Sequence, residues 1–225
     1  MQNVGYIAAA GLLAFGAYQL NKNSTTPTFT LPVNNDWLGS TAQTLASELS
    51  AGLKSVEGQL VGRLNLSSMR DVTRADVANG NVQAMLRVIR RGEGTADELG
   101  YRRIFGGELF DSFAKHPQVK VTKRYGTKTL TSTAAGAYQF LYSTWDETAK
   151  IMGFGDFSPA AQDYGAVARI AARGALEDVK AGRFEVALQK IAKEWASLPH
   201  SPYGQPVISM STASSTYTLA GGFFA

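Results

Sequence analysis

The stretch from residue 82 to residue 95 reads VQAMLRVIRRGEGT, and it decides how the rest of the chain is interpreted. Its apolar side chains recur at the three- and four-residue spacing of an amphipathic helix, which we expect to end near Gly92. The apolar face is formed by Met85, Val88 and Ile89. Glu93 is therefore delivered into a turn beside this face, and Gly92 and Gly94 let the backbone turn and leave open space. A carboxyl group in apolar surroundings keeps its proton at neutral pH, as a general acid must.

Taken alone, the GEGT segment is more typical of a solvated glutamate in a charged turn. In that interpretation Glu93 pairs with Arg90 or Arg91 and carries no chemistry. The two interpretations differ in whether the carboxyl group is buried, and the blocks of sequence that follow are needed to decide between them.

The composition bounds the class of protein. The chain has 225 residues, of which 44% are hydrophobic and 18% charged, as suits one good-sized globular domain with accessories or two small domains. It has no cysteine, which excludes disulfides, zinc–thiolate sites and thiol nucleophiles. A net charge of +4 favours an anionic partner such as a bacterial envelope, but no RNA-recognition motif, zinc finger or long basic block supports a nucleic-acid partner. The two histidines lack a carboxylate cluster at ligand spacing, so we expect no metal and no cofactor.

Residues 1–20 form an apolar N-terminal unit. Within it, residues 4–20 read VGYIAAAGLLAFGAYQL without a charge. This length is near the lower limit of a membrane-spanning helix, roughly 17–25 residues. No Lys or Arg precedes the stretch, so it lacks the usual charged start of a signal peptide. We expect it to enter a membrane at some stage, and the alternative is a helix buried against other protein subunits.

Residues 21–39 are rich in Ser, Thr, Asn and Pro and are interpreted as a linker. Residues 40–80 are expected to hold an amphipathic helix and a connector. A narrow stripe of Leu and Val follows at helical steps between residues 40 and 66. This stripe fits a helix that packs on a partner or in a short coiled coil, or equally a hairpin folded onto the next domain.

Residues 81–206 are expected to form a compact α+β domain. Alternation on either side of Tyr125-Gly126 predicts a small β-hairpin between residues 116 and 133. Ser158-Pro159 reads as a cap and first residue of a helix. The other predicted helices cover residues 136–152, 159–174, 175–180 and 184–196. Residues 207–225 are Ser/Thr-rich and are interpreted as a poorly ordered or partner-bound tail.

Five further blocks follow Arg91-Gly92-Glu93-Gly94-Thr95 in order along the chain. They are GGELF at 106–110, AGAYQF at 135–140, FSPAAQD at 157–163, WASLP at 195–199 and YGQ at 203–205. Their order and identity resemble the lambda-type phage endolysins, which are lytic transglycosylases on a lysozyme-like fold. The resemblance extends from about Met85 to Gln205, roughly half of the chain. It implies that peptidoglycan glycan strands are the substrate and that Glu93 is the catalytic acid.

The same resemblance implies a set of substrate-binding residues: Glu108, Tyr138, Gln139, Tyr203 and Gln205. Two of them have structural alternatives. Glu108 is more simply explained by hydrogen bonds to nearby backbone amides, and Tyr138 either stacks on a sugar or packs in the core. Trp145 and Trp195 are expected in the core, His116 in a structural role, and His200 at the surface or at the rim of the cleft.

One residue departs from the pattern, because Arg102 stands where the lambda endolysin has an acidic residue. The implied mechanism needs only one carboxyl group. Glu93 would protonate the glycosidic oxygen, and the C6 hydroxyl of muramic acid would then close on C1 to give a 1,6-anhydro sugar.

Three biological roles are compatible with this reading. In the first, the protein is part of the phage virion, bound to other particle proteins through residues 1–66 and the C-terminal tail, and opens the wall from the host periplasm during entry. In the second, residues 4–20 tether a lysis enzyme to the host membrane late in infection. In the third, the chain is a particle component with an inactive lysozyme-like domain. The intact RGEGT and AGAYQF blocks argue against the third.

Overall fold

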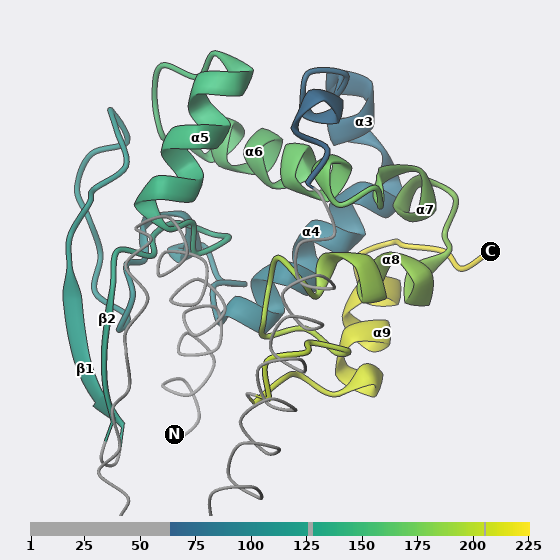
Figure 1. The fold of residues 1–225 in the computed structure, drawn as a ribbon. Coiled ribbons are helices and arrows are strands. Elements are labelled where there is room, and N and C mark those ends of the chain that lie inside the picture. Colours follow the sequence, from purple (N-terminus) through teal and green to yellow (C-terminus); the bar gives the residue numbers. More distant parts are fainter. Residues whose placement is uncertain (1–63, 126–127, 205) are drawn as a thin grey trace, which may run out of the picture.

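The computed structural model describes residues 64–125, 128–204 and 206–225, and the helix α4 (Gly80–Glu93) runs through its middle (Figure 1). The Asn79 side chain begins this helix by accepting hydrogen bonds from the amides of Asn81 and Val82. Gly94, with φ of 71°, ends it in the left-handed conformation that glycine adopts without strain. The helix predicted from the period of apolar residues is therefore confirmed, and it ends at Glu93.

Short and medium helices surround α4. They are η1 (Leu66–Met69), α3 (Arg74–Ala78), η2 (Gly100–Arg102), α5 (Tyr142–Met152), α6 (Pro159–Ala172), α7 (Leu176–Lys180), α8 (Phe184–Ile191) and α9 (Met210–Leu219). The start of α6 is as predicted, because the Ser158 hydroxyl accepts from the amide of Ala161 and Pro159 is the first helical residue. The predicted helix from 184 to 196 is wrong in its second half, since α8 ends at Ile191 and turns follow.

The predicted start of the helix from 136 to 152 is also wrong. The segment before Tyr142 is a turn in which Ala135 pairs with Phe140 as an isolated β-bridge. Gly136 and Gln139 both have positive φ, 79° and 47°, which no α-helix accommodates. The GAYQ block therefore forms a tight turn ahead of α5, and this difference decides where its side chains lie.

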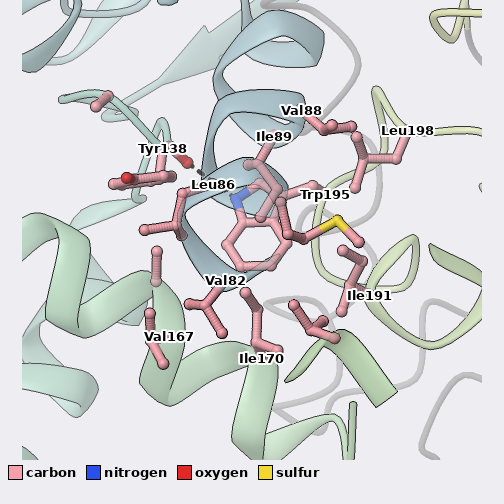
Figure 2. Packing of buried hydrophobic residues seen from close by; sticks show 14 of the residues in the cluster. Val82, Leu86, Val88, Ile89, Tyr138, Val167, Ile170, Ile191, Trp195 and Leu198 are labelled. Carbon is pink, nitrogen blue, oxygen red and sulfur yellow. Dashed lines mark hydrogen bonds between the residues drawn. The ribbon is translucent and has the colours of Figure 1, made fainter. Parts of the chain in front are cut away.

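Buried side chains of α4 and α6 enclose the indole of Trp195 (Figure 2). Its Nε1 donates a hydrogen bond of 3.2 Å to the carbonyl oxygen of Tyr138, which satisfies the polar atom of an otherwise apolar cluster. Trp145 lies in the same core and packs edge-on against Phe157. The expectation that both tryptophans are core residues is confirmed.

The only paired strands in the described residues are β1 (Val121–Tyr125) and β2 (Lys128–Ser132), which form the predicted antiparallel hairpin. In Figure 1 the hairpin stands at one edge of the molecule, away from α9. Its inner side contributes Val121 and Leu130 to a small second cluster around Phe105 and Ala134. The fold class of a helical domain with a small β-hairpin is therefore as expected.

The C-terminal segment is not a loose tail. Helix α9 packs against α4, and its Ala213 and Tyr217 are fully buried. Beyond the helix, the amide of Phe223 donates to the Asn81 side chain and the amide of Ala225 donates to the carbonyl of Gly182. Serine and threonine hydroxyls along α9 bond back to carbonyl oxygens four residues earlier, so a helix is hidden in a Ser/Thr-rich composition. The predicted domain end at residue 206 is wrong for this reason.

The compact domain also begins before residue 81. Met69 is fully buried against α6, and the amide of Asn65 donates to the carbonyl of Ala172. The Tyr164 hydroxyl donates to the carbonyl of Val72 across the same contact. The boundary predicted between connector and domain therefore lies too late in the chain. Predictions for residues 1–63 fall outside the described residues, and within those that are described no helix is long and apolar enough to cross a membrane.

Candidate active site

Glu93 is buried at the carboxyl end of α4, with 3% of its surface exposed. Its Oε1 accepts a hydrogen bond of 2.6 Å from the Ser197 hydroxyl, across 104 residues of sequence. Burial raises the pKa of Glu93 to about 7, and the hydrogen bond from Ser197 acts in the opposite direction. The group therefore exists in both protonation states near neutral pH, as a group that must give and take a proton requires.

The neighbouring arginines do not neutralise Glu93. The guanidinium of Arg90 donates to the carbonyl oxygens of Thr95 and Asp97 at 2.7–3.1 Å and lies over the Tyr101 ring, 4.5 Å from its centroid. Arg91 is exposed. The interpretation of Glu93 as a solvated residue paired with either arginine is therefore wrong.

Two turns meet beside Glu93. The Thr95 hydroxyl donates to the carbonyl of Ala137, which ties the turn after α4 to the GAYQ turn. Gly100 is needed for this arrangement, because a Cβ at its position would lie 1.9 Å from the carbonyl oxygen of Thr95. The AGAYQF block is thereby placed next to the turn that follows Glu93.

Gln139 is held rigidly in the second turn. Its Nε2 donates to the carbonyl oxygens of Gly136 and Arg103 at 3.0 and 3.3 Å, which fixes the orientation of the amide. Its Oε1 is buried without a hydrogen-bond partner among the described residues. A strained backbone and an unused acceptor are frequent in ligand-binding residues.

Tyr138 does not reach a sugar. Only 2% of its surface is exposed, and its hydroxyl donates a 2.6 Å hydrogen bond to Oδ1 of Asp163, which also accepts from the Tyr101 hydroxyl at 2.8 Å. The sequence left packing and stacking open, and burial selects packing. Direct substrate contact by Tyr138 is therefore corrected to a structural role behind the site.

The other residues implied as substrate-binding differ in exposure and in their contacts. Glu108 has an exposed side chain, and the hydrogen bond at this position is made by its carbonyl, which accepts from the Ile104 amide at 2.8 Å. The Tyr203 hydroxyl donates to the carbonyl of Lys193 at 3.0 Å, so this ring is fixed but half-buried. Gln205 lies outside the described residues.

Arg102, the departure from the family pattern, braces the loop that carries GGELF. Its Nε donates to the carbonyl of Phe110 at 2.9 Å, and its Nη2 lies 3.5 Å from the exposed carboxylate of Asp111. The next residue, Arg103, forms an ion pair with Asp97. These contacts give both arginines a structural role in the loop.

The histidines are used structurally or lie at the surface. His116 is buried, with Nε2 2.8 Å from the carbonyl of Phe140 and Nδ1 accepting from the amide of Gln118. Burial lowers its pKa to about 4, so the ring stays neutral, and its predicted structural role is confirmed. His200 is exposed and lies 3.7 Å from Glu185. No group of three potential metal-ligating side chains occurs within the described residues.

Ser197 is the residue that sequence reasoning missed. It lies in WASLP, a block that the resemblance had matched without assigning a role to each residue. The signal was a small polar residue between Trp195 and Leu198, both of which are buried. Gly92 was also misread, because it lies within α4 and leaves space for Ser197: a Cβ there would come within 2.6 Å of the Ser197 hydroxyl.

The sequence and the fold of this chain are similar to those of known proteins. The sequence pattern of the family described as Endolysin matches residues 83–224. The endolysin of Escherichia phage P2 is 38% identical over 157 residues, covering 63% of this chain and 93% of that protein. The endolysin of Escherichia phage lambda is 39% identical over 133 residues, covering 56% and 82%.

Solved structures agree with the sequence matches. The lysozyme of bacteriophage lambda in complex with a chitohexasaccharide superposes with a TM-score of 0.61 at 35% identity, covering 65% of this chain and 97% of that one. A second structure of lysozyme from bacteriophage lambda gives 0.58 over the same shares. The expected lysozyme-like fold is confirmed. The sequence match runs to residue 224, so the segment containing α9 belongs with the compact domain.

Proposed function

The chain belongs to the endolysin family, and from that premise we propose that it is a phage enzyme that degrades the bacterial cell wall. The substrate is the glycan strand of peptidoglycan, and the bond cleaved is the β-1,4 bond between N-acetylmuramic acid and N-acetylglucosamine. The lambda lysozyme held a chitohexasaccharide in its crystal, which supports a glycan as the ligand of this chain too. The observation that carries the proposal is the burial of Glu93 with its pKa raised to about 7.

In the first half of the reaction Glu93 is the general acid. It gives its proton to the glycosidic oxygen while the bond from that oxygen to C1 of muramic acid breaks. A group with a pKa of about 7 holds its proton in a large fraction of molecules at neutral pH and still releases it readily.

We assign the second half to the substrate's own C6 hydroxyl, so that the enzyme is a lytic transglycosylase. The two acidic side chains nearest in sequence have other surroundings: Asp97 pairs with Arg103, and Glu98 is exposed. The hydroxyl oxygen bonds to C1, and the Glu93 carboxylate accepts the hydroxyl proton. The product is a 1,6-anhydro sugar, no water is consumed, and Glu93 ends protonated as it began. An intramolecular nucleophile gains from proximity, by up to about 7–11 kcal/mol in the best cases.

Gln139, Tyr203, Gln205 and Glu108 complete the proposed site as substrate-binding residues. Of these, Gln139 has the strongest physical support, because its oriented amide has an acceptor left over for a hydroxyl or N-acetyl group. Tyr203 offers a half-buried ring face beside the WASLP segment.

Substitution of Glu93 tests the assignment. Glu93→Gln keeps the shape of the side chain and removes the acid, so we expect an unchanged fold and a loss of at least about a hundredfold in wall lysis. The matched control is Glu177→Gln, an exposed carboxylate on α7 outside the proposed site, which should leave lysis unchanged. Full activity in Glu93→Gln would refute the function.

Product analysis tests the mechanism separately. Digestion in ¹⁸O-labelled water should give anhydro-muramic acid ends, each one water lighter than a reducing end, with no label. Labelled reducing ends would make the enzyme a hydrolase while leaving Glu93 as its acid.

We propose further that the protein is carried in the phage virion and acts in the host envelope during entry. With α9 packed in the core, this proposal rests on the amphipathic pattern of residues 40–66 and the apolar residues 4–20. The alternative, a lysis enzyme tethered to the host membrane through residues 4–20, is favoured by the relatives named endolysins. Mass spectrometry of purified particles should detect the protein at structural copy number; its presence only in membranes of infected cells would support lysis.

A further inference from the structure

Ser197 lies in the turn that follows α8 and is fully buried. Its carbonyl accepts a hydrogen bond of 2.9 Å from the amide of Ile208, so both ends of the 198–207 loop are tied at this residue. The backbone bond and the complete burial of the side chain together hold the hydroxyl in a fixed position.

That fixed position is 2.6 Å from Oε1 of Glu93. A hydroxyl has one proton to donate, and a carboxylate accepts it strongly. Since Oε1 is occupied as an acceptor, the acidic proton of the neutral Glu93 must be carried on the other oxygen, Oε2. The contact thus distinguishes two oxygens that are chemically identical in a free glutamate.

Gly92 supports this arrangement because it has no side chain, and not because of its backbone conformation. It lies inside α4 without the positive φ that would require glycine, yet a Cβ there would come 2.6 Å from the Ser197 hydroxyl and 3.3 Å from the Leu198 side chain. Glycine in a helix interior is unfavourable relative to alanine. Glycine is found here although it is unfavourable in a helix, because an alanine would displace the serine hydroxyl.

Among the described residues, no charged side chain pairs with Glu93. Arg90, on the same helix, directs its guanidinium to the carbonyls of Thr95 and Asp97, and Arg91 is exposed. The segment packed from the other side contributes the hydroxyl of Ser197 and the apolar Leu198.

We propose that Ser197 is a positioning residue that, with the space left by Gly92, fixes Oε1 of Glu93 and makes Oε2 the oxygen that delivers and recovers the proton. The inference rests on the proposed function of Glu93 as general acid. After the proton has left, the same hydrogen bond becomes charge-assisted and stabilises the carboxylate until it accepts the proton of the C6 hydroxyl.

Three variants of the full chain test the proposal: Ser197→Ala, Gly92→Ala and the double variant. Each single change should lower kcat by about ten- to a hundredfold with the fold retained, the size expected for a hydrogen bond to a charged group. Loss of the hydrogen bond should also raise the pKa of Glu93 and move the alkaline limb of the kcat profile to higher pH. The added Cβ of Gly92→Ala meets mainly the hydroxyl that Ser197→Ala removes, so the double variant should be no worse than the poorer single one.

The matched control is Ser201→Ala, in the same loop. Its buried hydroxyl has no hydrogen-bond partner among the described residues, so its kcat and pH profile should equal those of the unmodified chain. A titration of Glu93 followed by ¹³C NMR of its side-chain carboxyl carbon gives the pKa independently of turnover.

The outcomes distinguish a failure of the proposed function from a failure of the role proposed for Ser197. If Glu93→Gln is active, the proposed function fails. If Glu93→Gln is inactive but the Glu93 pKa is the same in Ser197→Ala and in the unmodified chain, the role of Ser197 fails. Losses that multiply in the double variant would also overturn it, because the two changes would then act through separate contacts. If Ser197→Ala does not fold, Gly92→Ala carries the same readouts.

Discussion

Two glutamates with little-exposed side chains have opposite properties, although both lie near helix ends. At the end of α4, the partner of Glu93 is a neutral hydroxyl, and burial raises the pKa of Glu93 to about 7. Beyond α8, Glu194 lies between Arg169 of α6 and Arg173, the residue that follows this helix, with contacts of 2.7 Å to each. Burial would raise the pKa of Glu194 too, but the charges of the two arginines outweigh it and lower the pKa.

The difference teaches that the partner, not burial, decides what a buried carboxyl group can do. A carboxylate locked between two arginines cannot take up a proton near neutral pH and serves the fold. A carboxyl group opposite a hydroxyl can hold and release a proton near neutral pH, as the proposed chemistry requires. The fold achieves this by turning Arg90, the nearest buried cation on α4, toward the backbone of Thr95 and Asp97.

The largest expected effect comes from breaking the arginine-paired site. Glu194→Gln should destabilise the fold by about 3–5 kcal/mol, because two arginines of low exposure lose their counter-charge. Urea unfolding measures this, and the rate per folded molecule should stay unchanged. The control is Glu147→Gln, whose more exposed ion pair with Arg169 should cost about 1 kcal/mol or less. Equal costs in the two variants would contradict the comparison.

At the hydroxyl-paired site, replacing the glutamate by glutamine should instead stabilise the fold at alkaline pH. Because the pKa of Glu93 is about 7 in the fold against 4.5 for a glutamate in water, the favourable contribution of its protonated form to stability is present below pH 4.5 and is lost as the pH rises through 7. By pH 8 the loss should reach about 3 kcal/mol. Glu93→Gln should remove this dependence and be the more stable protein at pH 8. Parallel stability curves for the two proteins between pH 4 and 8 would refute the raised pKa.

A smaller effect is expected from Arg90, which tests whether a nearby arginine acts on Glu93 as Arg169 acts on Glu194. Arg90→Met should cost about 2 kcal/mol, since the carbonyls of Thr95 and Asp97 lose their donor. The Glu93 titration should not move. A clear rise of its pKa in this variant would mean that Arg90 stabilises the carboxylate after all.

Removing residues 1–63, which precede both glutamates, should have the smallest effect on stability and on the rate of cleavage. The remaining chain, 64–225, should be as stable as the whole and cleave isolated peptidoglycan at the same rate, while losing its place in particles or membranes. A chain that begins at residue 81 is the contrasting variant. It lacks Met69, buried against α6, and the Asp76–Lys180 ion pair, so it should unfold more easily.

What the sequence could predict was local. The period of α4, the Ser-Pro start of α6 and the alternation around Tyr125-Gly126 each lie within a few residues, and each element was found. The position of Glu93 followed from the same local pattern. The blocks that resemble endolysins added the family and the fold.

What it could not predict depended on distant partners or on unusual backbone. Ser197 meets Glu93 across 104 residues, so no spacing rule connects them. Gln139 has a left-handed backbone that its residue type does not announce, and this turned a predicted helix start into a turn. Helix α9 was missed because its hydroxyls are satisfied by its own carbonyls, which composition alone does not reveal.

The position of α9 in chain order has a consequence for the cell that makes the protein. The ribosome synthesises α4, with Glu93 at its end, well before the helix that buries one of its sides, and α9 follows every other element of the core. Domains generally fold as units during synthesis. We therefore expect the packing around α4 to be completed only after residues past Tyr217 have left the exit tunnel. We therefore expect a nascent or prematurely terminated chain that lacks α9 to be inactive, because one side of α4 is still uncovered.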